Sequence, residues 1–293
     1  MRSVLSETGE IRNVSDTALW VAIYRALESE RSDALFHDPY ARRLGGARGE
    51  AIVERMPGGK ASAWPIIVRT AVMDEIILRC INQGVRCVLN LAAGLDTRPY
   101  RLDLPSELRW FHVDFPDMID YFTGQMREES PRCQLEFVPA DLRLAETRRE
   151  VFRRAAAHGP VLVITEGLLL YLEAAEVAAL ADDLHHHAGA RWWLTDLASP
   201  MLLRFLKKRW QPSLRNVNAP FRFGPAEGTA FFEPHGWREA EFRSSWDESL
   251  RLRRSVRFSW LWQLLGRLQP AEKREKSRRM SAIVLLQNQN PAS

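Results

Sequence analysis

Asp114 and a run of small residues before it are spaced to recognise a nucleoside. Residues 85–91 form a short apolar run typical of a strand buried on both faces of a parallel sheet, and residues 92–94, Ala-Ala-Gly, follow it. Asp114 lies near the end of a second apolar run, residues 109–115, twenty positions after Gly94. A carboxylate at the end of the second strand, beside the first turn, can accept hydrogen bonds from both ribose hydroxyls. A tight turn without a ligand is the alternative for the three small residues taken alone.

The glycine content of the turn separates two classes of cofactor. A dinucleotide site needs the pattern G-x-G-x-x-G, whose backbone N–H groups face a pyrophosphate. The corresponding positions here are Ala92, Gly94 and Thr97. One glycine makes a poor phosphate cradle but is sufficient for S-adenosylmethionine, whose tail is an amino acid joined to a sulfonium. The turn therefore favours a methyl donor, approaching the main chain at Ala92 and Gly94, over a nicotinamide.

With this turn and Asp114, the sequence resembles the leucine carboxyl methyltransferase family, and within it the bacterial branch that includes tetracenomycin-type polyketide O-methyltransferases. The resemblance extends over roughly residues 15 to 175, and the turn followed by Asp-Thr-Arg is more specific than a generic glycine loop. The matching stretches are DALFHDPYA, VLNLAAGLDTRPYRL, WFHVDFP, PADLR and ITEGLLLYL. The resemblance implies S-adenosyl-L-methionine as cofactor and a methyltransferase fold.

Four further residues are candidates for holding the cofactor. The family pattern places an arginine, here Arg69, against the cofactor's carboxylate, where bidentate pairing would suit the task; a solvated charge on a helix surface is the alternative. Asp141 would accept from the adenine amino group and Leu142 would lie against the ring, or Asp141 could be a helix N-cap. Glu166 follows the most clearly buried strand, at the end where ligands bind a doubly wound sheet, and could receive the donor's ammonium or be a partly solvated cap.

Two residues correspond to family positions near the transferred methyl group. We expect Arg143 and Tyr171 to orient the acceptor as the catalytic residues of the site. Arg143 could instead be a surface charge at a helix start, and Tyr171 a packed aromatic with its hydroxyl satisfied. His235, in a late turn, is a candidate general base, which a phenolic acceptor would need more than a carboxylate.

The elements that must position these residues indicate an α/β fold. We predict a doubly wound, mostly parallel, seven-stranded Rossmann-like sheet with an antiparallel last strand, within one domain spanning residues 1–293. Its parts would be an N-terminal helical cover, a cofactor-binding core, an acceptor-side insertion after the fifth strand, and C-terminal strands with a helix. The corresponding ranges are 1–82, 83–197, 198–237 and 238–293.

Several segments are harder to assign. The helix expected over residues 17–28 could be a lid over the cofactor or could simply pack on the sheet. Glycines mark residues 44–60 as a loop with one short element. The pattern becomes irregular from residue 198 to about 232, where aromatic residues could form an acceptor wall or plain core. Residues 256–265 indicate an aromatic helix or a mixed segment.

Composition excludes several classes of protein. No apolar run approaches the roughly 18 residues of a membrane span, and the three cysteines support neither a disulfide framework nor a zinc site, which favours the cytoplasm. The residues of the His tract 185–187 point about 100° apart on a helix and cannot share one ion, so we expect no metal. The net charge of +4 is local, because residues 251–279 hold ten basic and two acidic side chains. Nucleic acid is therefore a disfavoured partner.

These observations favour an O-methyltransferase that modifies a carboxyl or hydroxyl oxygen of a small molecule, such as a polyketide. A second hypothesis keeps the cofactor and makes the acceptor a protein's terminal carboxylate. A third is a non-catalytic protein that binds RNA or an acidic partner through residues 251–279. A nicotinamide oxidoreductase is disfavoured by the turn. The sequence leaves the acceptor's identity and the oligomeric state open.

Overall fold

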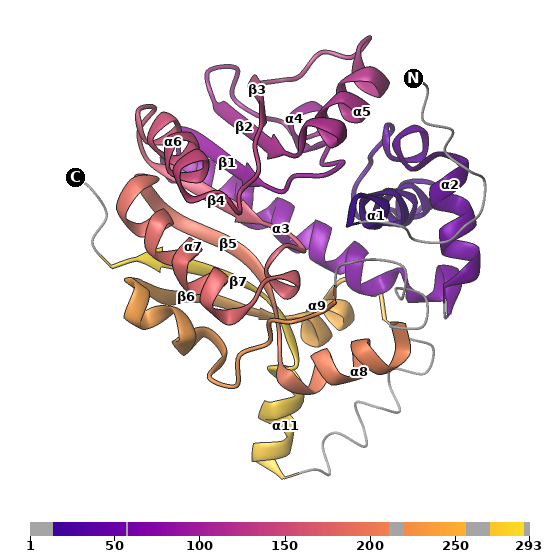
Figure 1. Ribbon diagram of the computed structural model, residues 1–293. Helices are drawn as coiled ribbons and strands as arrows, with labels where there is room; N and C mark the ends of the chain where they lie inside the picture. The colour runs from indigo at the N-terminus through magenta and orange to yellow at the C-terminus, as the bar shows by residue number, and fades with distance from the viewer. Residues whose placement is uncertain (1–13, 57, 211–219, 256–269, 290–293) are drawn as a thin grey trace.

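The computed structural model describes residues 14–56, 58–210, 220–255 and 270–289 (Figure 1). Residues 256–265, for which the sequence indicates an aromatic helix or mixed segment, lie outside these ranges. No helix in the described ranges is long and apolar enough to cross a membrane.

Seven strands of the described chain form one sheet in the order β3-β2-β1-β4-β5-β7-β6. All neighbouring pairs are parallel except those of β7, which runs antiparallel to both β5 and β6. The predicted mostly parallel sheet with an antiparallel last strand is confirmed. The strands are β1 Cys87–Leu91, β2 Arg109–Asp114, β3 Gln134–Pro139, β4 Val161–Thr165, β5 Ala190–Ala198, β6 Trp237–Ser244 and β7 Ser281–Asn288.

Helices cover both faces of the sheet because side chains of the buried strands alternate between two cores. In β4, Val161 and Val163 join a core with the helices α6 (Ala145–Ala156) and α7 (Ala174–His187). Leu162 and Ile164 point the other way and pack with α3 (Trp64–Asn82). Figure 1 shows α6 and α7 on the viewer's side of the sheet. Burial on both faces explains why these strands are continuously apolar.

The N-terminal helices α1 (Val14–Ser29) and α2 (Ala41–Arg55) pack tightly on each other, and this corrects one prediction. Residues 44–60 were expected to be mainly loop, but α2 continues through Arg55. A Cβ at Gly45 would come within 2.5 Å of Ile23 Cδ1, and one at Gly49 within 2.8 Å of the Leu19 carbonyl oxygen. These two glycines therefore permit close helix packing rather than mark a loop, while Gly46, with φ +56°, produces a kink.

The remaining helices are mostly short. The segment from residue 198 to about 232, expected to be irregular, contains a full helix, α8, and the beginning of a 3-10 helix, η3. The division of the chain into cover, core, insertion and C-terminal part stays a prediction. These helices are η1 Gly59–Ser62, α4 Arg98–Arg101, α5 Pro116–Met126, η2 Leu169–Tyr171, α8 Pro200–Trp210, η3 Gly228–His235, α9 Ser245–Arg251 and α11 Ala271–Arg278.

Candidate active site

A cavity of about 910 Å³ opens at the carboxyl ends of β1, β2, β4 and β5. The chain crosses from β3 at one edge of the sheet to β4, so the connections after β1 and β4 leave in opposite directions. Such a switch point leaves a crevice between neighbouring strands, which is where open α/β sheets bind ligands. The cavity is lined by α1, α3, η2 and α8 as well as by the strand ends.

The loop after β1 holds its backbone in an unusual conformation. Ala92 has φ +51° and Gly94 has φ +54°, both in the left-handed region. For Ala92 this conformation costs about 1 kcal/mol. The Ala93 N–H donates to the Val113 carbonyl of β2 at 3.1 Å, which fastens the loop to the sheet. Hence the main chain faces the cavity with few side chains in the way.

Two buried side chains of β2 bind the two backbone polar groups of Gly94. The Gly94 N–H donates to Asp114 Oδ2 at 2.7 Å, and the Gly94 carbonyl lies 3.2 Å from His112 Nε2. Burial lowers the pKa of His112 to about 4, so the ring is neutral at pH 7 and donates through Nε2. Asp114 Oδ1 also accepts from the Phe115 N–H at 2.7 Å, and burial raises the pKa of Asp114. The predicted closeness of Asp114 to the turn is present in the structure.

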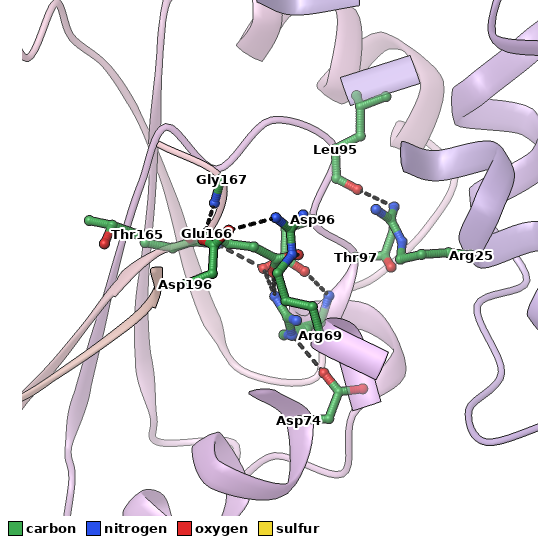
Figure 2. A network of polar contacts seen from close by, with 12 residues as sticks. Arg25, Arg69, Asp74, Leu95, Asp96, Thr97, Thr165, Glu166, Gly167 and Asp196 are labelled. Carbon is green, nitrogen blue, oxygen red and sulfur yellow. Dashed lines mark hydrogen bonds and ion pairs between the residues drawn. The ribbon is translucent and has the colours of Figure 1, made fainter. Parts of the chain in front are cut away.

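Arg69 joins the ends of β4 and β5. Its Nε donates to Glu166 at 3.0 Å and its Nη1 to Asp196 at 3.0 Å (Figure 2). Asp196 also accepts from the Gly167 N–H at 2.6 Å. Arg98 Nη1 reaches the other oxygen of Glu166 at 2.7 Å. Burial would raise the pKa of Glu166, but Arg98 and Arg69 outweigh it and hold that pKa at about 2, so Glu166 is ionised.

Behind this group, further ion pairs extend the network. Arg98 Nε donates to Asp74 at 2.6 Å, and Arg101 forms a bidentate pair with the same carboxylate at 2.7 and 2.9 Å. Arg25 Nε donates to Asp38 at 2.8 Å and its Nη2 to the Leu95 carbonyl at 2.6 Å. Figure 2 shows that the network draws on α1, α3, the loop after β1 and the ends of β4 and β5. We call the part of this network that lines the cavity the charged floor. It consists of Arg25, Arg69, Arg98, Arg101, Glu166 and Asp196.

Another part of the cavity wall is apolar and contains Tyr171. The Tyr171 ring packs on Phe221 with centroids 5.6 Å apart. Burial raises the pKa of Tyr171 to about 12, although a hydrogen bond with Thr17 acts in the other direction. Tyr171 is therefore a neutral group that can donate or accept one hydrogen bond. Other apolar residues of this wall are Trp20, Trp64, Pro65, Ile66, Leu170, Met201, Leu202, Phe205 and Leu206.

The structure brings only some of the predicted site residues together. Those that line the cavity are Arg69, Ala92, Gly94, Asp114, Glu166 and Tyr171. Asp141, Leu142 and Arg143 do not line it. Arg143 is 70% exposed, donates to Asp141 at 2.6 Å and lies over the Phe115 ring at 5.6 Å. The roles predicted for these residues stay predictions.

The contacts of Asp141 and His235 exclude two roles considered for them, helix N-cap and general base. Asp141 is not the N-cap of α6, which begins after Leu144; its carboxylate instead accepts from the Arg143 N–H at 3.0 Å. His235 lies 2.8 Å from Asp182 and does not line the cavity, so we do not retain it as a general base. Within the described residues, no group of histidine, cysteine, aspartate and glutamate could hold a metal ion.

Three cavity residues escaped the sequence analysis. Asp196 lies near the carboxyl end of β5, next to Glu166 just after β4, so the same rule about strand ends could have identified it. Arg98 lies within the Asp-Thr-Arg motif, but its partners come from distant parts of the chain. Thr70 is 1% exposed and its hydroxyl has no hydrogen-bond partner in the described structure. No sequence pattern indicates that property.

Comparison with known proteins identifies the family. The family model described as leucine carboxyl methyltransferase matches residues 18–185, more than half of the chain. A protein of Parafrankia sp. (strain EAN1pec), named as an S-adenosyl-L-methionine-dependent methyltransferase, is 34% identical over 254 residues, 79% of each chain. A protein of Streptomyces coelicolor with the same description is 33% identical over 219 residues, 68% of this chain and 76% of its own.

Solved structures support the fold. A crystal structure from Thermobifida fusca YX, described as a methyltransferase, has a TM-score of 0.53 at 16% identity and covers 92% of this chain and 94% of its own. A DUF574 family protein from Streptomyces avermitilis has a TM-score of 0.56 at 12% identity, covering 92% and 96%. From its sequence match and its cavity, we conclude that this chain belongs to the leucine carboxyl methyltransferase family and is a methyltransferase that uses S-adenosyl-L-methionine.

Proposed function

We propose that the protein transfers the methyl group to a carboxyl or hydroxyl oxygen of a small molecule, such as a polyketide. The observation that carries this proposal is the continuity of the cavity, which runs from the loop after β1 to the aromatic wall beside Tyr171. A donor held at the loop would direct its methyl group toward a space that suits a compact apolar acceptor.

The residues of the loop fit the adenosyl part of the donor. Each oxygen of Asp114 accepts one backbone N–H, and a carboxylate oxygen has two lone pairs, so both can also accept from ribose hydroxyls. Gly94 leaves room for the amino-acid tail, since a Cβ there would already contact Ala18 at 3.3 Å. In this proposal Asp141 and Leu142 hold the adenine from beside the cavity.

The amino-acid tail would lie on the charged floor. Its carboxylate would pair with Arg69 and its ammonium with Glu166, which is ionised at neutral pH. Thr70 offers a buried hydroxyl whose hydrogen bond is still available for the tail. Arg143 and Tyr171 would orient the acceptor, Arg143 after leaving Asp141.

The bound donor supplies a methyl group on a sulfonium, which is already an excellent leaving group. The chain's own residues then have to align the acceptor oxygen and exclude water, and few groups need to exchange protons. The apolar wall around Tyr171 serves both tasks, because it encloses the acceptor without competing nucleophiles.

The family description also admits a protein's terminal carboxylate as acceptor. Binding of RNA through residues 251–279 finds less support, because several arginines of that segment are held in ion pairs within the chain. Arg251 pairs with Glu75 and Arg254 with Glu28.

Methyl transfer assays with S-adenosylmethionine can decide between the two acceptor classes. We expect transfer to members of a panel of aromatic hydroxy and carboxylic acids, and little to a peptide that ends in leucine. Transfer to the peptide, with none to any small molecule, would overturn the proposal.

A further inference from the structure

We propose that the acceptor is an uncharged, largely apolar molecule and that the methyl group goes to a hydroxyl rather than to a carboxylate. This inference rests on the proposed function and names the acceptor class for the same cavity. It follows from the charges on the cavity floor, from the position of Arg143 and from the composition of the wall.

Every arginine that lines the cavity in the described structure is already neutralised. Arg69 pairs with Glu166 and Asp196, and Arg98 pairs with Asp74, Asp96 and Glu166. The other two are Arg25, paired with Asp38, and Arg101, paired with Asp74. The carboxylate of the bound donor's amino-acid tail would add a further negative partner to Arg69. An acceptor carboxylate would therefore find no cationic side chain in the described lining that lacks a partner, and burying a charge unpaired by the protein is costly.

The charged groups around the cavity also carry a negative excess. Four arginines line it against four carboxylates, namely Asp96, Asp114, Glu166 and Asp196. Asp38 and Asp74 lie behind the arginines and add two further negative charges. A negative excess attracts the cationic methyl donor but repels an anionic acceptor. The same floor that suits the donor therefore disfavours a carboxylate beside it.

Arg143, which the sequence analysis expects to orient the acceptor, is engaged elsewhere. Its guanidinium donates to both oxygens of Asp141 and lies over the Phe115 ring, outside the cavity lining. To serve a carboxylate it would have to leave both contacts.

The wall supplies apolar surface in place of charge. Met201 and Phe205 on α8 line the cavity while 46% and 55% exposed. They face the same cavity as Trp20, Trp64 and Tyr171, from α1, α3 and η2. Large exposed apolar side chains gathered around one cavity mark a binding surface, and a flat apolar acceptor would cover them. Recognition would come from this apolar contact, with Tyr171 offering one neutral hydrogen bond to the acceptor hydroxyl.

The reaction balances with solvent water as the proton acceptor. A lone pair of the hydroxyl oxygen forms the new C–O bond, the electron pair of the C–S bond returns to sulfur as a neutral thioether, and the hydroxyl proton passes to water.

Calorimetry with three matched ligands tests the inference on the full chain. The ligands are 9-phenanthrol, phenanthrene-9-carboxylate and the uncharged phenanthrene-9-carboxamide, each titrated into protein saturated with S-adenosylhomocysteine at pH 7. We expect the phenol and the amide to bind at least about tenfold more tightly than the carboxylate. Equal or tighter binding of the carboxylate, or no binding of any of the three, would overturn the inference.

A charge-removing variant sharpens the test. Asp196→Asn keeps the shape but frees one pairing position of Arg69, so the carboxylate should gain at least about threefold in affinity relative to the phenol. Asp247→Asn removes the same charge from an exposed ion pair with Arg278 and should leave that ratio unchanged. A ratio that fails to move in Asp196→Asn would contradict the argument from charge.

Binding of S-adenosylhomocysteine distinguishes failure of the proposed function from failure of the inference about the acceptor. Wild-type protein that fails to bind S-adenosylhomocysteine would refute the proposed function and this inference together. Protein that binds it but prefers the carboxylate would overturn only the inference, and loss of that preference in Arg143→Gln would assign the carboxylate to Arg143.

Discussion

Replacing Asp114 by alanine should remove the main anchor of the donor's ribose. In the structure its two oxygens are held by the N–H groups of Gly94 and Phe115 at 2.7 Å each, which leaves lone pairs for both ribose hydroxyls. A hydrogen bond to a charged group contributes about 1.5–3 kcal/mol, so two such bonds are worth at least about 3 kcal/mol. We therefore expect Asp114→Ala to weaken S-adenosylhomocysteine binding about 100-fold or more.

Calorimetry with two ligands can assign that loss to the ribose. Wild-type protein should bind S-adenosylhomocysteine more tightly than its 2′-deoxy analogue, whereas Asp114→Ala should bind the two equally, as a double-mutant cycle requires. Asp120→Ala, on the exposed side of the following helix, is the matched control and should bind like wild type. An Asp114→Ala variant within about threefold of wild type would refute the assignment of the ribose.

The pH dependence of the same binding gives a further check on Asp114. Burial raises its pKa above the ordinary value of 3.8, and the ionised form is the better acceptor. Affinity for S-adenosylhomocysteine should therefore fall as the pH drops through this raised pKa, and Asp114→Ala should lose that dependence.

Three other variants test separate parts of the site. Gly94→Val places a branched side chain at φ +54° beside Ala18, so it should reduce S-adenosylhomocysteine affinity at least about tenfold by calorimetry; normal binding would show that the loop is misplaced. Thr70→Val should weaken S-adenosylhomocysteine about tenfold yet leave methylthioadenosine, which lacks the amino-acid tail, unaffected; equal losses for both ligands would exclude a role toward the tail. Arg98→Met should lower the free energy of unfolding by about 3–5 kcal/mol at pH 7 in urea, because it leaves buried carboxylates unpaired. Since the pKa of Glu166 is about 2 in the folded chain against an ordinary 4.5, that contribution is present above about pH 4.5 and is lost as the pH falls toward 2. The difference in the free energy of unfolding between wild type and Arg98→Met should therefore become smaller over that range. A difference that does not change with pH would contradict the pairing.

The sequence was most informative where short-range rules apply. The apolar runs before residue 92 and around Asp114 predicted two neighbouring parallel strands, and the Gly94 N–H indeed donates to Asp114. The antiparallel final strand followed from counting the alternating units. Glycine spacing was misleading in α2. Gly45 and Gly49 permit close contact with α1, and the local sequence does not indicate where α1 lies.

The sequence was least informative about which charged groups pair. Arg69 and Asp196 are 127 positions apart, and only the sheet order brings them together. Arg143 and Asp141, two positions apart, pair with each other instead of entering the cavity. Pairing depends on the competition among all nearby partners, which a motif does not record.

A crystal structure of the protein with S-adenosylhomocysteine tests the central claim most directly. We expect both ribose hydroxyls within hydrogen-bond distance of Asp114 and the amino-acid tail passing over Gly94 toward Arg69. An adenosyl group bound away from the ends of β1 and β2 would contradict the account.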